Sequence, residues 1–414
     1  MDLHAVPLFF ALIGLILYTV LGGADFGAGL WQLSAGSGRM GARIREHAEH
    51  AIAPVWEANH VWLIFVLTVV WTAYPAAFGS MASTLSVPLF VAGIGMVLRG
   101  AAYALHAGAD PSRTRLAIDT VFSLSSILTP FALGAAVGGI ASRRVPVGNA
   151  AGDLVSSWLN PTSIMIGILA VAIAAFLAAV YLAADALRQV QPVLAQQFRA
   201  RALGSGVLAG ALSVGGLVVL RADSPALYRG LTSGAGLVAL ISCVLAGVLT
   251  MGLVLARRFT VARYTAALAV ASIVAGWALA QQPVFLPGLT VRDAAAPRDT
   301  LIAVTMAVLG GAVILFPSLG LLFRLVLRGR FDPERSAVDP DVPARPRRGR
   351  AATRLPARIA GACLLVGIGL LTVAESGWAH AVGVLALVGF VVAGFAAVAP
   401  DDLAATDRRP EAHR

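Results

Sequence analysis

Residues 5–33 read AVPLFFALIGLILYTVLGGADFGAGLWQL, a continuous apolar run in which Asp25 is the only charged residue. A helix needs about 20 mostly apolar residues to cross a bilayer, so this run predicts a membrane-spanning helix. The whole chain has the same character, since 58% of its 414 residues are hydrophobic and only 13% are charged. The sequence therefore predicts an all-α, polytopic integral membrane protein.

The same length rule divides the chain into about eleven predicted spans. About nine of them form a core, expected as two four-helix bundles, and the last two form a C-terminal hairpin. The predicted organisation is a transmembrane core over residues 1–330, a Pro- and Arg-rich cytoplasmic linker over 331–356, the hairpin over 357–399 and a cytoplasmic tail over 400–414. The predicted spans lie near residues 5–33, 58–78, 81–105, 116–141, 161–187, 202–221, 232–256, 261–281, 299–328, 357–374 and 379–398.

The basic residues indicate how the chain is oriented in the membrane. All 31 are arginines, and they gather in alternate short loops, beginning with those around Arg39 and Arg113. Basic loops stay on the cytoplasmic side, so the N-terminus is predicted outside and the C-terminus inside. The net charge of +10 does not indicate nucleic-acid binding, because the arginines are spread between apolar runs rather than over one surface.

Charged residues inside spans are costly and are therefore the first candidates for function. On this topology five of them lie toward the cytoplasmic ends of their helices: Asp25, Glu57, Arg99, Asp119 and Asp185. Together with His60 they predict a path for protons entering the membrane from the cytoplasm. The alternative is structural: Arg99 neutralises Asp25 or Glu57, while Asp119 and Asp185 are solvated near the interface.

Asp25 is surrounded by glycines in the segment GGADFGAG of residues 22–29. Small residues at such spacing allow close helix packing, so this segment is expected to contact a neighbouring helix or subunit. The predicted packing glycines are Gly22, Gly23, Gly27 and Gly29.

A second polar segment, APVWEANHVWLI, covers residues 53–64. Glu57 lies where a helix N-terminus favours negative charge, which makes capping the simpler alternative to a proton role. His60 shares the helix face of Glu57, Trp56 fits an interfacial anchor, and Asn59 is expected in packing. One Glu-x-x-His pair without a second does not predict a di-iron site, and no metal is expected. Residues 39–50 predict an amphipathic helix on the cytoplasmic membrane surface.

These two segments, in this order, resemble the cytochrome bd quinol oxidase subunit II family. That family has a Gly-x-Asp-Phe-Gly-x-Gly run, followed by a Pro-x-Trp-acidic-Gly-Asn-polar-Val-Trp-Leu run. Asn160-Pro161, Tyr181-Leu182 and the segment QQPVFLPGLTVRDAAAP of residues 281–297 are also similar to it. The resemblance extends from about Val6 to Arg330.

The resemblance implies a haem-free subunit in the bacterial plasma membrane, with no catalytic residue or cofactor of its own. Its partner would be a haem-bearing subunit I that carries haems b and d, and the complex would oxidise quinol and reduce dioxygen to water, with quinone as a further ligand. Glu57 and Asp25 match the acidic positions of the two family segments, which implies a part in proton delivery from the cytoplasm.

The chain departs from the family pattern in three places. Ala58-Asn59-His60 replaces the usual Gly-Asn-Gln, Arg99 is followed by GAAYALHAG rather than an Arg-Pro-containing run, and the hairpin beyond Pro356 is additional. These departures leave open a divergent branch of the family, whose partner takes electrons from a donor other than a quinol. The sequence also leaves two other hypotheses open: a proton-coupled secondary transporter, or an assembly subunit without a proton role.

Overall fold

The computed structural model describes every residue except 1, 53–55, 107–112, 328–353, 374–375 and 399–414. Its contacts separate two units, Met1–Leu319 and Gly320–Arg414. The predicted tail and nearly all of the predicted linker lie outside the described residues, so the proposed organisation of that region stays a prediction.

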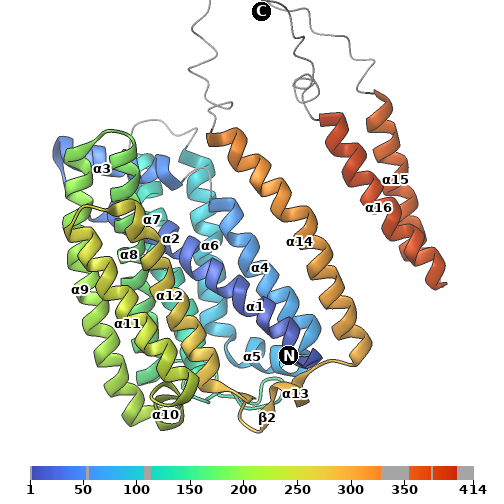
Figure 1. Cartoon of the computed structure of the whole chain (residues 1–414), viewed down its shortest axis with the longest axis horizontal. Coiled ribbons are helices and arrows are strands. Elements are labelled where there is room, and N and C mark those ends of the chain that lie inside the picture. Colours follow the sequence, from blue (N-terminus) through green and yellow to red (C-terminus); the bar gives the residue numbers. More distant parts are fainter. Residues whose placement is uncertain (1, 53–55, 107–112, 328–353, 374–375, 399–414) are drawn as a thin grey trace, which may run out of the picture. The chain divides into compact units, whose positions relative to one another are not determined.

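The first unit consists of long helices with short connections (Figure 1). Among the described residues, nine helical segments, counting α1 to α2 as one, run between its two ends, and the last of them continues beyond Leu319 into the second unit. They are α1 (Val6–Leu17), η2 (Tyr18–Gly22) and α2 (Gly23–Leu33), then α4 (Trp56–Ala73), α6 (Ser86–His106), α7 (Arg113–Ala141), α8 (Pro161–Arg188), α9 (Pro192–Asp223), α11 (Gly234–Leu255), α12 (Phe259–Gln281) and α14 (Arg298–Leu327). The predicted all-α architecture is confirmed.

Short elements lie at the two ends of these helices (Figure 1). Helix α3 (Gly38–Ile52) lies at the end that we call the α3 end. The opposite end, which we call the α5 end, carries η1 (Leu3–Ala5), α5 (Pro75–Thr84), α10 (Pro225–Leu231) and α13 (Val291–Ala294). It also carries a small antiparallel hairpin of β1 (Val284–Leu286) and β2 (Leu289–Thr290).

The second unit contains α15 (Arg354–Val373) and α16 (Gly377–Val398). The two helices pack through small residues, because a Cβ added at Gly367 would lie 2.6 Å from Leu387 Cδ2, and one at Gly389 would lie 3.2 Å from the sulfur of Cys363. This close approach is what the predicted hairpin requires.

Eight described helices are long and apolar enough to cross a membrane, while three apolar helices are shorter, namely Asn59–Ala73 within α4 and the apolar parts of α15 and α16. These eleven segments correspond to the eleven predicted spans. The third predicted span begins at residue 86 rather than 81, because Pro75 starts the separate helix α5 after α4 has ended at Ala73.

Helix α8 lies at the centre of the first unit. It packs against α2 and α7 as well as α9 and α12, and its middle is lined with buried alanines such as Ala174, Ala178 and Ala183. Small side chains let neighbouring backbones approach, which is how helices associate inside a membrane. The share of buried residues in the apolar stretch is 56% for α8 but only 6% for α14.

Helix α3 forms where the amphipathic pattern predicts a helix. Its apolar face packs against protein, and its position on the membrane surface stays a prediction. Ile44 and Ala48 are buried in the same core cluster as Phe198 of α9, and the ring of His47 lies 5.6 Å from that of Phe198. The helix therefore covers the ends of α2 and α8.

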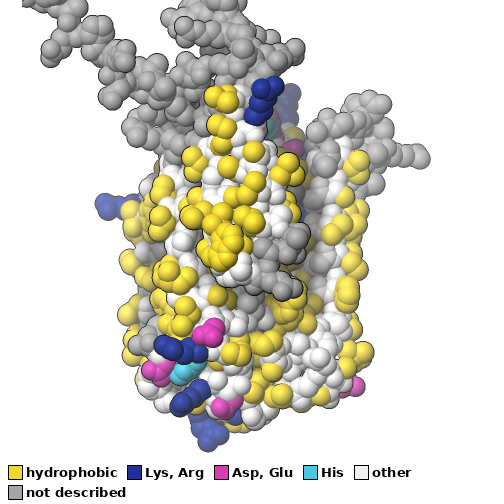
Figure 2. Space-filling model, turned by 90° about the vertical axis from the view of Figure 1, so that its right-hand side faces the viewer, with side chains coloured by type: hydrophobic (Ala, Val, Ile, Leu, Met, Phe, Trp, Pro, Cys, Tyr) yellow, Lys and Arg dark blue, Asp and Glu magenta, His cyan; other side chains and the backbone are white. Residues whose placement is uncertain are grey.

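Hydrophobic side chains run along the middle of the face in Figure 2, while most of the charged side chains that it shows lie toward its lower and upper ends. This distribution matches a bilayer, because the hydrocarbon core accepts apolar side chains and the interfaces accept charged ones. The fold is thus that of a multi-pass membrane protein.

Candidate functional site

The polar centre of the first unit is an ion pair between Arg99 of α6 and Asp25 of α2. Arg99 Nη2 lies 2.6 Å from Asp25 Oδ1 and also donates to the Asp25 backbone carbonyl at 3.0 Å. The two side chains are 2% and 1% exposed. The structure therefore brings together two of the predicted site residues and confirms the pairing of Arg99 with Asp25 rather than leaving either charge alone.

Aromatic and hydroxyl groups complete the surroundings of Arg99. Its guanidinium carbon lies 4.2 Å from the ring centroid of Phe122 and 5.0 Å from that of Phe26, and its Nη1 donates to the hydroxyl of Ser126. Aromatic faces stabilise a desolvated guanidinium by attraction to the ring quadrupole. The charge of Arg99 is thus held by α2, α6 and α7 together.

The glycines around Asp25 let these helices meet. A Cβ at Gly27 would lie 1.9 Å from the Ala174 carbonyl oxygen of α8, and one at Gly29 would lie 2.2 Å from Ser126 Oγ of α7. At Gly23 the nearest atom is a Leu177 methyl at 3.3 Å, and at Gly22 only the ring of Tyr18 is near. Gly27 is therefore needed because a backbone lies against it, and Gly29 because the side chains of Ser126 and Arg99 do.

His60 of α4 lies beside this pair. Its ring makes edge contacts with Phe26 at 6.1 Å and with Tyr18 at 6.2 Å between centroids. The buried Tyr18 hydroxyl and Asp25 Oδ2 have no hydrogen-bond partner within the described parts of the chain. The site thus places a carboxylate oxygen and a phenol in a buried region adjoining an imidazole.

Asn59 links α4 to the first helix at the point where that helix is irregular. Its side-chain nitrogen donates to the Leu21 carbonyl at 3.3 Å, and Leu21 belongs to the π-helical turn η2. A π-turn inserts one residue into an α-helix and is often found at functional sites. The side chain of Asn59 is buried and joins two helices, as the predicted packing role requires.

Three predicted candidates are placed only by their backbone. Trp56 and Glu57 form the first turn of α4, and Asp119 lies in α7. Their side chains lie outside the described residues. Glu57 is the second residue of α4, one turn before His60, so its backbone lies in the first turn of that helix.

Asp185 does not join this site. Its carboxylate pairs with Arg188 at 2.5 Å, accepts from Gln189 at 2.8 Å and lies 3.6 Å from Nε2 of His47. Its side chain is only 14% exposed, so it is a group paired with Arg188 within α8 and close to α3 rather than a solvated one.

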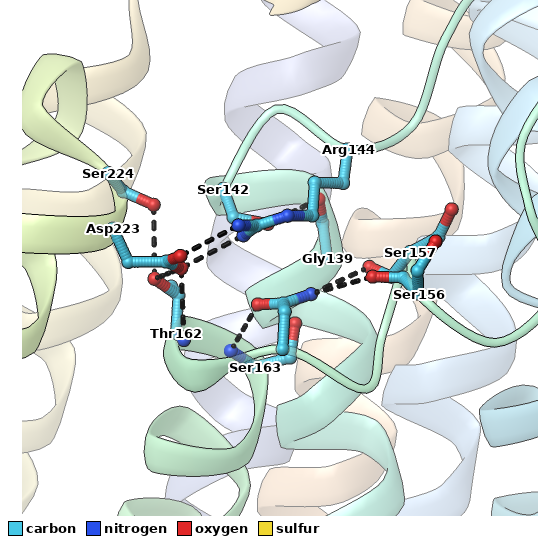
Figure 3. Close-up of polar contacts among 10 residues, drawn as sticks. Gly139, Ser142, Arg144, Ser156, Ser157, Thr162, Ser163, Asp223 and Ser224 are labelled. Carbon is cyan, nitrogen blue, oxygen red and sulfur yellow. Dashed lines mark hydrogen bonds and ion pairs between the residues drawn. The ribbon is translucent and has the colours of Figure 1, made fainter.

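A second polar network lies at the α5 end (Figure 3). Arg144 makes two hydrogen bonds to the carboxylate of Asp223, at 2.7 and 2.9 Å, and Asp223 accepts from the Thr162 hydroxyl at 2.6 Å. Beside it, Asn160 caps α8 by accepting from the Ser163 amide. The bidentate bond raises the pKa of Arg144, so the guanidinium stays charged and ties the 142–160 loop to α8 and α9.

Within the described residues there is no group of three or more His, Cys, Asp and Glu side chains suited to a metal. Buried His47 has its Nε2 at 3.2 Å from the Leu182 carbonyl as well as near Asp185.

Sequence reasoning did not select Ser126, Phe122 or Tyr18, which surround the charge pair, nor the Arg144–Asp223 bridge. The pair Ser125-Ser126 lies in the middle of a predicted span and could have indicated a helix contact, because polar side chains in spans tend to face other helices. Phe122 and Tyr18 carried no such signal among many apolar neighbours.

The fold and the site define a polytopic α-helical membrane protein with a buried carboxylate–guanidinium pair in its core. Over residues 3–326 the chain matches the family described as cytochrome bd terminal oxidase subunit II. It belongs to that family, which consists of subunits of respiratory oxidoreductases.

Two individual proteins illustrate the similarity. Cytochrome bd ubiquinol oxidase subunit 2 of Bacillus subtilis (strain 168) is 27% identical over 129 residues, which is 31% of this chain and 37% of that protein. The alignment thus spans little more than a third of that relative. The structure of bd oxidase from Geobacillus thermodenitrificans matches with a TM-score of 0.60 and 24% identity, covering 79% of this chain and 99% of that one. This likeness establishes a shared fold.

Proposed function

We propose that this chain is the haem-free subunit II of a cytochrome bd-type terminal oxidase. In this proposal it pairs with a haem-bearing subunit I, and the complex oxidises quinol and reduces dioxygen to water. The observation that carries the proposal is the family match over residues 3–326, which contains both polar segments. In this proposal the haems b and d belong to the partner.

We further propose that the chain helps deliver protons from the cytoplasm to its partner, through Glu57, His60 and the Asp25–Arg99 pair. Glu57 is the entry group in this scheme, because it begins α4 at the α3 end, where the basic loops are. His60 supplies a titratable ring one turn farther along. Arg99 holds Asp25 Oδ1, and Oδ2 has no hydrogen-bond partner among the described residues, so this buried oxygen can accept a hydrogen bond from a further group of the path.

The test requires the complex, because the electron steps take place in the partner. The chain is produced with the haem-bearing subunit and purified through a tag on this chain, and a reduced-minus-oxidised spectrum and quinol-driven oxygen uptake are recorded. Glu57→Gln and Asp25→Asn are compared with Glu46→Gln, a matched control on the exposed face of α3.

The proposal predicts haem bands in every preparation, with oxygen uptake reduced at least tenfold in Glu57→Gln and unchanged in Glu46→Gln. Normal oxygen uptake in Glu57→Gln would contradict the proton role of Glu57 and indicate that it only caps the helix. The assignment as subunit II would remain. A well-folded chain that brings down no haem protein would overturn the assignment itself and direct attention to transport assays.

A further inference from the structure

An apolar groove of about 740 Å³ lies between α2, α7, α8 and α9, on the side of the first unit away from α4. Its walls include Trp31 of α2, Phe131 of α7, Ile168 of α8 and Leu208 of α9. Ile168 is 43% exposed and Leu208 is 54% exposed, so the groove opens outward from the bundle. In a membrane protein this opening faces lipid.

One end of the groove is cationic. Arg201 lines it, and its guanidinium carbon lies 5.8 Å from the ring centroid of Trp31. Along α9, Arg201 is 22 residues from Asp223, roughly 33 Å at the rise of an α-helix. Asp223 belongs to the polar network at the α5 end. Since the hydrocarbon core is about 30 Å thick, Arg201 lies at the opposite membrane boundary, where lipid phosphates are found.

No carboxylate of the described residues neutralises the charge of Arg201. Its hydrogen bonds to described residues are both made by Nη1, to the backbone oxygen and side-chain oxygen of Gln197 at 3.2 and 3.4 Å. It forms no ion pair with a carboxylate in the described ranges. Neighbouring Arg199 differs, because it donates to the carbonyls of Val254 and Leu255 that end α11. Arg201 thus has donors left for an anion.

The groove also continues away from this charge. From Arg201 to Leu212 its α9 wall is about 16 Å long by helical rise. At Gly204 an added Cβ would meet nothing within 4 Å, so the groove is open there. A cation at the headgroup level followed by a long apolar trough matches the two parts of a phospholipid.

We propose that this groove binds one anionic phospholipid, with its phosphate on Arg201 and an acyl chain along Gly204, Leu208 and Leu212. Trp31 lies over the guanidinium at the interface, as amphipathic aromatic side chains do. The site is independent of the Asp25–Arg99 pair and of the proposed electron chemistry.

The test is native mass spectrometry of the full chain, purified in detergent with the subunits that accompany it. Phosphatidylglycerol is titrated onto the delipidated protein, with phosphatidylcholine as the neutral comparison. We expect one tightly retained phosphatidylglycerol per chain. Arg201→Gln should weaken its retention about ten- to a hundredfold, the range for a lost charge-assisted hydrogen bond, and Arg201→Lys should restore part of it.

Two glycine variants give a control that does not depend on the charge. Gly204→Leu places a side chain in the groove and should abolish retention, whereas Gly210→Leu adds the same side chain at another open position of α9 outside the groove and should not. Both variants gain the same helix propensity. Unchanged retention in Gly204→Leu, equal retention of phosphatidylcholine, or retention of a quinone instead of a phospholipid would each overturn the proposal.

Discussion

Arg99 and Asp25 meet 2.6 Å apart although 74 residues separate them in the chain, and neither side chain is more than 2% exposed. The contact is enclosed by α2, α6 and α7, and it includes a bond from Arg99 to the Asp25 backbone. Burial of two charges is costly, so each residue depends on the presence of the other.

Removing one charged partner should therefore lower the stability of the folded protein more than removing both. Arg99→Met leaves the Asp25 carboxylate buried without its counter-ion, and we expect a loss of about 3–5 kcal/mol in stability. The double variant Asp25→Leu/Arg99→Met should be more stable than Arg99→Met alone. Thermal unfolding midpoints of the complex in detergent rank the stabilities of these variants, with the exposed substitution Arg229→Met as a control. A double variant less stable than both single variants would contradict this account.

Gly27 sets the distance between α2 and α8. Gly27→Ala would place a methyl group 1.9 Å from a backbone oxygen, so the helices must separate, at a cost of about 1–3 kcal/mol or more. Gly23→Ala meets only a movable Leu177 methyl at 3.3 Å and should be nearly neutral. Unfolding midpoints and the yield of folded protein compare the two. Equal unfolding midpoints and equal yields for the two variants would show that stability does not depend on the close approach of α2 and α8.

Arg144→Gln should loosen the α5 end, because Asp223 would lose both bonds of its bidentate partner. Arg144→Lys keeps the charge but not the forked geometry, and it should lie between wild type and Arg144→Gln. We expect a loss of about 1–3 kcal/mol for Arg144→Gln. Hydrogen exchange of residues 142–160 measures the loosening, and faster exchange confined to another region would refute the assignment.

Asp153 makes the turn at the start of residues 153–158 sensitive to acid. The amides of Ser156 and Val155 donate to its Oδ1, which lowers the pKa of Asp153 below its ordinary value. A lowered pKa stabilises the turn above the ordinary pKa, and this contribution is lost as the pH falls through the lowered one. Exchange of residues 154–158, corrected for its intrinsic pH dependence, should rise on acidification in wild type.

The control for this turn is Asp153→Asn, which keeps an acceptor but does not titrate. It should retain partial protection that does not change with pH in the acid range. A pH-dependent rise of the same size in Asp153→Asn would mean that another group controls the turn.

The span pattern and the two residues of the charge pair were predictable from the sequence. The residues that surround the charge pair, and the helices that pack together, were not. Apolar run length alone locates helices such as α8 and α11, because the bilayer fixes the length that they need. Asp25 and Arg99 stand out as costly charges. Phe122 and Ser126 do not, since their role depends on which face of α7 meets α6. The burial of α3 likewise depends on tertiary packing that an amphipathic pattern cannot specify.

The π-turn over Tyr18–Gly22 has a consequence for how this segment can vary. The turn accommodates its extra residue locally, because an i→i+5 turn takes more residues than the 3.6 of an α-helical turn. A one-residue insertion or deletion in the regular winding of α1 would instead shift the azimuth of Asp25 by about 100° and turn its carboxylate away from Arg99. Homologous chains are therefore expected to vary in length by one residue at the π-turn more readily than within α1.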